Sequence, residues 1–180
     1  MLHAGSLYGG RKPAALFAAL AALRDRGVID AQSFCFRQIG RVALSGFDMA
    51  EERDRLRLQG IVEMLPATQR RDILREMISA SCLLLLQPGT TVSIPGKLFE
   101  YLASGIPIVG IGPVNGDAAD VIVKSKAGEI FDRNDEAAMM AMIRKHYELW
   151  NEGKVVSTTD ATPFTRKKLT DQLIGILERL

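Results

Sequence analysis

The continuous apolar run at residues 82–86, CLLLL, constrains the fold of this chain more than any other feature. So short and wholly apolar a run is typical of a strand buried on both faces, as at the centre of a parallel sheet covered by helices. Along the rest of the chain, strand-like runs alternate with helical patterns. The alternation predicts an α/β fold with a doubly wound parallel sheet, Rossmann-like, forming a single domain over residues 1–180.

The expected boundaries follow from apolar periodicity and from glycine, proline and capping residues. Pro13 is expected at the first helical position, Gly27 as a helix stop, and Thr68 as a helix cap. The expected strands are 1–6, 31–39, 61–65, 82–86, 106–111 and 128–131. The expected helices are 13–26, 51–59, 69–79, 97–104, 117–125 and 135–150, then a polar connector at 151–162 and a closing helix at 163–180 with an apolar stripe.

Composition excludes several classes of protein. A formal net charge of +2 and an aromatic content of 6% argue against nucleic-acid binding. No apolar segment is long enough for a membrane span, and the N-terminus lacks a signal-peptide pattern, so we expect a cytoplasmic location. Cys35 and Cys82 lie in apolar runs and are expected to be buried free thiols, without metal-ligand spacing to His3 or His146.

The segment 94–109, IPGKLFEYLASGIPIV, predicts a Pro-Gly loop, a short helix and a buried strand. Lys97, Glu100 and Ser104 are three and four residues apart and share one helical face. A lysine and free N–H groups at a helix N-terminus suit phosphate, and a carboxylate one turn later can accept hydrogen bonds from hydroxyls. Together these features indicate a nucleotide. The alternative is an intrahelical Lys97–Glu100 ion pair, which contributes only about 0.2–0.5 kcal/mol.

Two loops each follow the carboxyl end of a predicted strand and are expected to face one crevice at the sheet edge. In the loop 5–11, the glycines allow close approach of the backbone to a ligand, and Arg11 offers a fork of donors for phosphate. The alternative is a plain strand-to-helix turn with a solvated arginine. The loop 87–96 carries small polar side chains for phosphate, sugar hydroxyls or helix capping: Gln87, Thr90, Thr91 and Ser93.

Two motifs approach known nucleotide-binding patterns but depart from them. The segment from Gly89 to Lys97 differs from a P-loop in the spacing of its glycines, and Leu98 stands where a magnesium-binding hydroxyl is needed. After the strand at 106–111, Asn115 replaces the third glycine of a dinucleotide fingerprint. His3 precedes the first loop and could approach the crevice, although a lone histidine near a strand end is more often structural. His146 is expected to lie on the surface.

Several segments in order resemble the nucleotide-binding half of retaining GT-B glycosyltransferases (glycosyltransferase family 4, group 1). These segments are HAGSLYGGRKP, VEMLPATQRRDILREM, PGKLFEYLASGIPIVGIGP, GDAADVI, AGEIF and FTRKKLTDQLIGILERL. The resemblance covers essentially the whole chain. Its closest pattern is the Pro-Gly-Lys-Leu-Phe-Glu-Tyr run of surface-polysaccharide transferases.

The resemblance implies a site. Arg11 and Lys97 would be the catalytic residues, stabilising the diphosphate that departs as the sugar is transferred, and Glu100 would accept hydrogen bonds from the ribose hydroxyls. No metal or other cofactor is implied. The remaining implied nucleotide-sugar-binding residues are Gly5, Ser6, Gly10, Leu65, Pro66, Thr90 and Ser93, of which Leu65 and Pro66 would flank the base. This chain departs from many members at Val92, which replaces a glutamate, and at Ser6, which replaces an arginine.

The implied function is the donor-binding domain of a retaining glycosyltransferase of hexosyltransferase type. It would move a sugar from a nucleoside-diphosphate sugar to a polysaccharide or lipid-linked acceptor in the bacterial envelope. The acceptor-binding N-terminal domain precedes this half in the family, so we expect the chain alone to be inactive and to self-associate through its exposed apolar surface. We expect the full-length enzyme at the cytoplasmic face of the membrane.

Two other functions are compatible with the same residues. A non-catalytic nucleotide-binding or regulatory module could use this fold, because fold alone does not fix function. An upstream acceptor domain in the gene would favour the enzyme over the module. A phosphotransfer enzyme would instead require magnesium-dependent binding of a nucleoside triphosphate.

Overall fold

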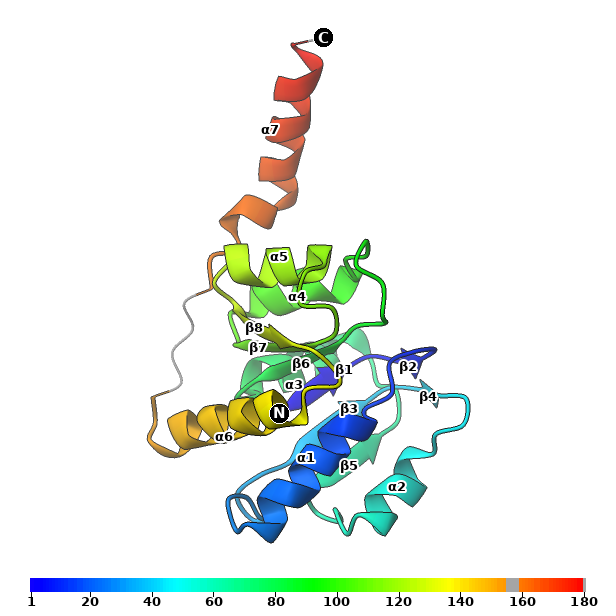
Figure 1. Ribbon diagram of the computed structural model, residues 1–180. Helices are drawn as coiled ribbons and strands as arrows, with labels where there is room; N and C mark the ends of the chain where they lie inside the picture. The colour runs from blue at the N-terminus through cyan, green and yellow to red at the C-terminus, as the bar shows by residue number, and fades with distance from the viewer. Residues whose placement is uncertain (155–158, 180) are drawn as a thin grey trace.

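A six-stranded parallel sheet forms the centre of the computed structural model, which describes residues 1–154 and 159–179 (Figure 1). The strand order is β5-β3-β1-β6-β7-β8, so the chain builds outward from β1 and then restarts beside it at β6. This is the doubly wound order expected from the sequence. The strands are β1 (Leu2–Ala4), β3 (Phe36–Ile39), β5 (Val62–Leu65), β6 (Leu83–Leu86), β7 (Ile108–Ile111) and β8 (Gly128–Phe131).

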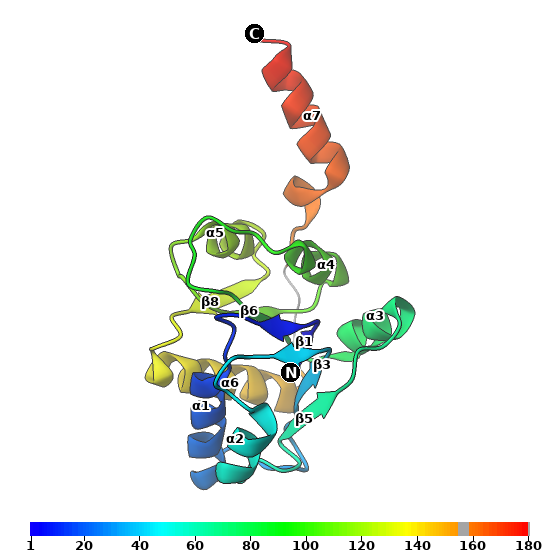
Figure 2. The ribbon, with the colours of Figure 1, turned by 90° about the vertical axis from the view of Figure 1, so that its right-hand side faces the viewer.

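Helices cover both faces of the sheet (Figures 1 and 2). One face packs against α1 (Ala14–Asp25) and α6 (Glu136–Asn151), with α2 (Met49–Arg55) beside α1. The other face packs against α3 (Arg70–Ser79), α4 (Gly96–Ser104) and α5 (Asp117–Lys124). A small parallel pair, β2 (Leu7–Tyr8) and β4 (Val42–Ala43), extends the loops after β1 and β3 and was not predicted.

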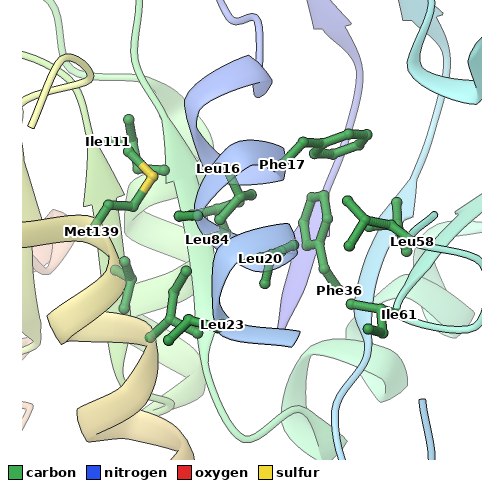
Figure 3. Packing of buried hydrophobic residues seen from close by; sticks show 14 of the residues in the cluster. Leu16, Phe17, Leu20, Leu23, Phe36, Leu58, Ile61, Leu84, Ile111 and Met139 are labelled. Carbon is green, nitrogen blue, oxygen red and sulfur yellow. The ribbon is translucent and has the colours of Figure 1, made fainter. Parts of the chain in front are cut away.

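The leucines of β6 alternate between two hydrophobic cores. Leu84 and Leu86 point toward α1 and α6, whereas Leu83 and Leu85 point toward α4 and α5. Figure 3 shows the first core, where Leu84 packs among side chains of α1 and α6. All four leucines are buried, as the apolar run at 82–86 predicted.

Several predicted boundaries were wrong for local reasons. The strand expected at 31–39 is confined to Phe36–Ile39, because the Asp30 carboxylate accepts hydrogen bonds from the backbone N–H groups of Gln32 and Ser33 and holds a turn. Thr68 is not a cap: α3 begins one residue later than expected, after Gln69. Pro13 is the N-cap of α1 rather than its first helical residue. Asp48 caps α2, which begins and ends earlier than the expected 51–59.

The last described helix does not close onto the body of the domain. A 3-10 turn, η1 (Thr162–Phe164), leads into α7 (Arg166–Leu177), which projects away from the sheet (Figures 1 and 2). Among its described residues, none is buried. The expected connector at 151–162 includes residues 155–158, which lie outside the described residues. Within the described ranges, no helix is long and apolar enough to cross a membrane.

Both cysteines are free thiols, as expected. Cys82 is buried, and burial raises its pKa to about 11. Cys35 is only partly buried.

Candidate functional site

The two loops singled out from the sequence meet at the reversal of strand order. The loop 5–11 leaves the carboxyl end of β1, and the loop 87–95 leaves the carboxyl end of β6. These strands are neighbours, with Leu2 paired to Leu83. The prediction that both loops lie at one edge of the sheet is therefore confirmed. In doubly wound sheets this reversal is where ligands bind. We call the group of His3, Gly5, Arg11, Lys97 and Glu100 the switch-point site.

Lys97 stands in the first turn of α4, an end that no side chain caps within the described part of the chain. Its Nζ lies 3.1 Å from His3 Nε2. Gly5 makes room for it: a Cβ on Gly5 would lie 2.8 Å from that Nζ. The φ of Gly5 is +125°, which also disfavours any residue with a side chain. The ammonium group is thus held at the mouth of the β1 loop, beside an uncapped helix N-terminus that attracts anions.

His3 is fully buried in β1, and its tautomer follows from its neighbours. Nδ1 lies 2.9 Å from the carbonyl oxygen of Leu84, which can only accept, so Nδ1 carries the hydrogen. Nε2 is then free to accept a hydrogen bond from Lys97. Burial lowers the pKa of His3 to about 3, and the charges of Lys97 and Arg11 add to this effect. His3 is therefore neutral.

The charge on Lys97 is itself disfavoured before any ligand binds. Burial lowers its pKa to about 8, and the nearby Arg11 contributes in the same direction. The carboxylate of Glu100 acts in the opposite direction. An anion at this position would relieve the repulsion between the two cations.

Glu100, one turn after Lys97, pairs with a residue of another helix. Its carboxylate lies 2.8 Å from Nη2 of Arg70, at the start of α3. The expected alternative was an ion pair between Lys97 and Glu100 within α4. Among the described residues, Glu100 pairs with Arg70 instead, and Lys97 contacts His3. Both partners of the Arg70–Glu100 pair are well exposed, so the bond is weak and open to competition from a ligand.

Arg11 is half-buried and lies over the ring of Tyr8, 4.3 Å from its centroid. The residue before it, Gly10, is connected to the loop 87–95 by Arg133. The Arg133 guanidinium donates to the carbonyl oxygen of Gly10 at 3.0 Å and to that of Gln87 at 2.6 Å. Sequence reasoning missed Arg133, although its position just after β8 places it at the carboxyl edge of the sheet.

Two buried glutamines also support the loops and were not predicted to do so. Gln38 of β3 donates to the carbonyl oxygen of Gly5 at 2.8 Å, and Gln87 donates to that of Ser93 at 3.1 Å. Within the described residues, the amide oxygen of each glutamine is buried without a partner. At the end of β3, the backbone of Gly40 packs closely against that of Gly5. A Cβ on Gly40 would lie only 2.7 Å from Gly5 C and O, so the close approach requires a glycine at this position.

The other predicted binding residues lie outside the group defined as the switch-point site. Ser6 and Thr90 are exposed on the two loops, and Ser93 is half-buried. Leu65 and Pro66 are exposed at the carboxyl end of β5, two strands from β1. The Arg70–Glu100 pair connects α4 to the start of α3, which follows that segment.

The prediction that His146 lies on the surface was wrong. It is half-buried in α6, and within the described ranges its Nε2 is buried without a partner. It lines a cavity of about 250 Å³ at the amino edge of the sheet, opposite to the switch-point site, together with Cys35 and Trp150. Burial lowers the pKa of His146, and Lys145 adds to the effect. Residues 1–154 and 159–179 contain no cluster of three His, Cys, Asp or Glu residues placed to hold a metal ion.

Neither a family model nor a curated protein matches this sequence. Solved structures do match. WaaG, a glycosyltransferase involved in lipopolysaccharide biosynthesis, aligns over 90% of this chain and 43% of its own, with TM-score 0.63 and 17% identity. Anabaena Alr3699/HepE in complex with UDP aligns over 99% of this chain and 49% of its own, with TM-score 0.69 and 17% identity.

A third structure is the lipopolysaccharide outer core galactosyltransferase WaaB in its apo form, with TM-score 0.66 and 14% identity over 99% of this chain and 49% of its own. The chain therefore spans less than half the length of each of these proteins. At such identities the similarity is one of fold. The chain has the fold of one half of a GT-B glycosyltransferase.

Proposed function

We propose that this chain is the donor-binding domain of a retaining glycosyltransferase and that the switch-point site binds a nucleoside-diphosphate sugar. The observation that carries the proposal is the position of Lys97. It stands at an uncapped helix N-terminus beside Arg11, where the strand order reverses. A fixed pair of cations at the positive end of a helix suits a diphosphate.

The rest of the site suits the nucleoside. Glu100 lies one turn after Lys97, and its carboxylate can accept hydrogen bonds from two ribose hydroxyls once it leaves Arg70. The exposed segment Leu65–Pro66 lies beyond that ion pair and would flank the base. Ser6, Gly10, Thr90 and Ser93 would contact the diphosphate or the sugar from the two loops.

The chemical role of the cations follows from charge. When the sugar leaves the donor, negative charge develops on the departing diphosphate, and preorganised donors lower the barrier by stabilising it. Lys97 and Arg11 can do this without a metal ion. We propose that they are the catalytic groups that this domain contributes.

The whole reaction requires more than this chain. Because the chain spans less than half of WaaG, HepE and WaaB, we propose that a separate acceptor-binding domain completes the enzyme. The chain alone would bind the donor without transferring sugar. The complete protein would be a hexosyltransferase that acts on a polysaccharide or lipid-linked acceptor at the cytoplasmic face of a bacterial membrane. HepE has been solved with UDP and with UDP-glucose, which makes these the first ligands to test.

The test is thermal unfolding with UDP, GDP, CDP, ADP or dTDP in the presence of a chelator. A ligand at about ten times its Kd adds about 1.4 kcal/mol to the free energy of unfolding, a shift of about 3–6 °C for this chain length. We expect the shift with one base and its loss in Glu100→Ala. Glu148→Ala, which removes an exposed ion pair of α6, is the matched control and should retain the shift. The absence of a shift with all five diphosphates would contradict the proposal.

A further inference from the structure

We propose that His3 is a positioning residue that holds the Lys97 ammonium group for the diphosphate of the donor. The inference rests on the proposed function for its ligand. Its structural half, the control of Lys97 by a buried histidine of β1, rests on the geometry of the ligand-free chain.

The hydrogen-bonding chain has a defined direction. Leu84 O accepts from His3 Nδ1 at 2.9 Å, which leaves the lone pair of Nε2 facing Lys97 Nζ at 3.1 Å. A carbonyl of the central strand β6 thus fixes the ring, and the ring fixes the lysine. Because the imidazole is fully buried, rotating it to offer a different atom would require its packed neighbours to move.

A fixed lysine is useful to a phosphate site. A free lysine side chain carries about 2 kcal/mol of rotamer entropy, part of which is lost on binding a ligand. Here His3 restricts the ammonium group before the ligand arrives, and the missing side chain of Gly5 leaves the space that it occupies.

The charges around Lys97 also predict that donor binding is coupled to proton uptake at this amine. Arg11, from the segment after β2, faces Lys97 with a positive charge, and Glu100 of α4 faces it with a negative one that is shared with Arg70 of α3. His3 of β1 is neutral. Burial and Arg11 hold the pKa of Lys97 at about 8 in the free chain. A bound diphosphate adds negative charge and raises this pKa, so the complex takes up a proton.

The sign of the pH dependence follows. Because the pKa of Lys97 is higher in the complex, affinity is full below pH 8 and falls as the pH rises above it. From pH 7 to pH 8.5 the Kd should rise about fourfold. UDP-glucose is the appropriate probe, because a diphosphate diester does not titrate in this range; if another base binds in the thermal test, its sugar nucleotide replaces it.

The experiment is a double-mutant cycle measured by titration calorimetry. His3→Leu removes the acceptor for Lys97 and retains an apolar volume, whereas His3→Gln keeps an acceptor near the position of Nε2. We expect His3→Leu to weaken binding about tenfold or more and His3→Gln to recover most of the loss. In a Lys97→Met background, His3→Leu should have less than a twofold further effect, and the rise of Kd with pH should disappear.

Proton uptake is measured in the wild-type protein from the dependence of the binding enthalpy on buffer ionisation enthalpy. At pH 8.5 we expect about 0.7 proton taken up per ligand. A zero value would overturn the coupling. An equal effect of His3→Leu with and without Lys97 would overturn the positioning role, since His3 would then act through the fold alone. If both variants fold and His3→Gln binds the ligand as weakly as His3→Leu, the positioning role is also overturned.

A ligand-free measurement separates this inference from the proposed function. The titration of the Lys97 amine, followed by ¹⁵N NMR, should have a lower midpoint in His3→Leu than in the wild-type protein, because the ammonium loses its acceptor. An unchanged midpoint would overturn the His3–Lys97 link. If no sugar nucleotide binds the wild-type protein, the proposed function and the diphosphate coupling fail, while this titration still decides the link.

Discussion

Two histidines whose pKa values are lowered by burial make the folded chain sensitive to acid. The pKa of His3 is lowered to about 3, and that of His146 is also lowered. A histidine with a depressed folded pKa binds a proton more readily when unfolded, so stability is full above the unfolded value of about 6.5 and falls as pH decreases below it. His3 alone should cost about 2 kcal/mol of unfolding free energy between pH 7 and pH 5.

Urea unfolding at pH 7 and pH 5 measures this loss. His3→Gln, which does not titrate, should lose about 2 kcal/mol less than the wild-type protein over this interval. An identical loss in the two proteins would show that His3 is not the group responsible.

The residues of the switch-point site could be predicted in type but not in their contacts. The spacing of Lys97 and Glu100 correctly placed both on α4, and the glycine loop correctly placed Arg11 near them. Their hydrogen-bond partners, His3 and Arg70, come from β1 and α3, far away in sequence. Local periodicity contains no information on such pairs, and His146 was misplaced for the same reason.

At the scale of the loops, Arg133 connects the segments after β1 and β6 through two backbone carbonyls. Arg133→Ala should leave the sheet intact and free both loops, because the guanidinium is their shared donor. Hydrogen exchange at residues 9–11 and 87–91 should become faster, and nucleotide affinity should fall several-fold. Arg144→Ala, which removes an exposed ion pair of α6, is the matched control. Unchanged exchange in both loops would contradict this role.

The close contact between the turns after β1 and β3 depends on Gly40. Its φ is +133°, and a Cβ there would lie 2.7 Å from the Gly5 backbone. Gly40→Ala should therefore destabilise the fold by about 1–3 kcal/mol and displace the Gly5 turn. Gly89→Ala, where a Cβ would meet no atom within 4 Å, should change stability by less than about 0.5 kcal/mol. Equal denaturation midpoints for the two variants would contradict this account.

Strands and helices were predictable where apolar pattern alone decides them, as in β6, α4 and α6. Boundaries failed where one side chain redirects the backbone. Asp30 turns the chain ahead of β3, and Asp48 starts α2 two residues before the expected helix. The short strands β2 and β4 were not predictable, because each has only two residues and is held by pairing with the other rather than by its own sequence pattern.

At the scale of the whole molecule, α7 exposes an apolar stripe to solvent. Leu173, Ile176 and Leu177 are each more than half exposed. We predict that the isolated chain self-associates through this stripe, because burial of such side chains removes apolar area from water. Sedimentation velocity should show a concentration-dependent species that Leu173→Asp abolishes. Gln172→Asp, the same change of charge outside the stripe, should retain it. A wild-type protein that stays monomeric at all concentrations would contradict this prediction.

The doubly wound fold was predictable because the leucines of β6 must be covered on both faces, which requires helices on both sides of a parallel sheet. The position of α7 was not. Its apolar stripe predicts an amphipathic helix, but a helical pattern does not say which surface the helix covers. In this chain it covers no part of the sheet.

The most direct test of the central claim is to map where a sugar nucleotide binds. Backbone amide NMR shifts of the chain would be recorded with and without UDP-glucose, or with the sugar nucleotide selected by the thermal test. We predict changes confined to the loops 5–11 and 87–95, the first turn of α4 and the end of β5. Changes centred on the cavity lined by Cys35, His146 and Trp150, at the opposite edge of the sheet, would contradict the account, and so would the absence of changes at saturating ligand.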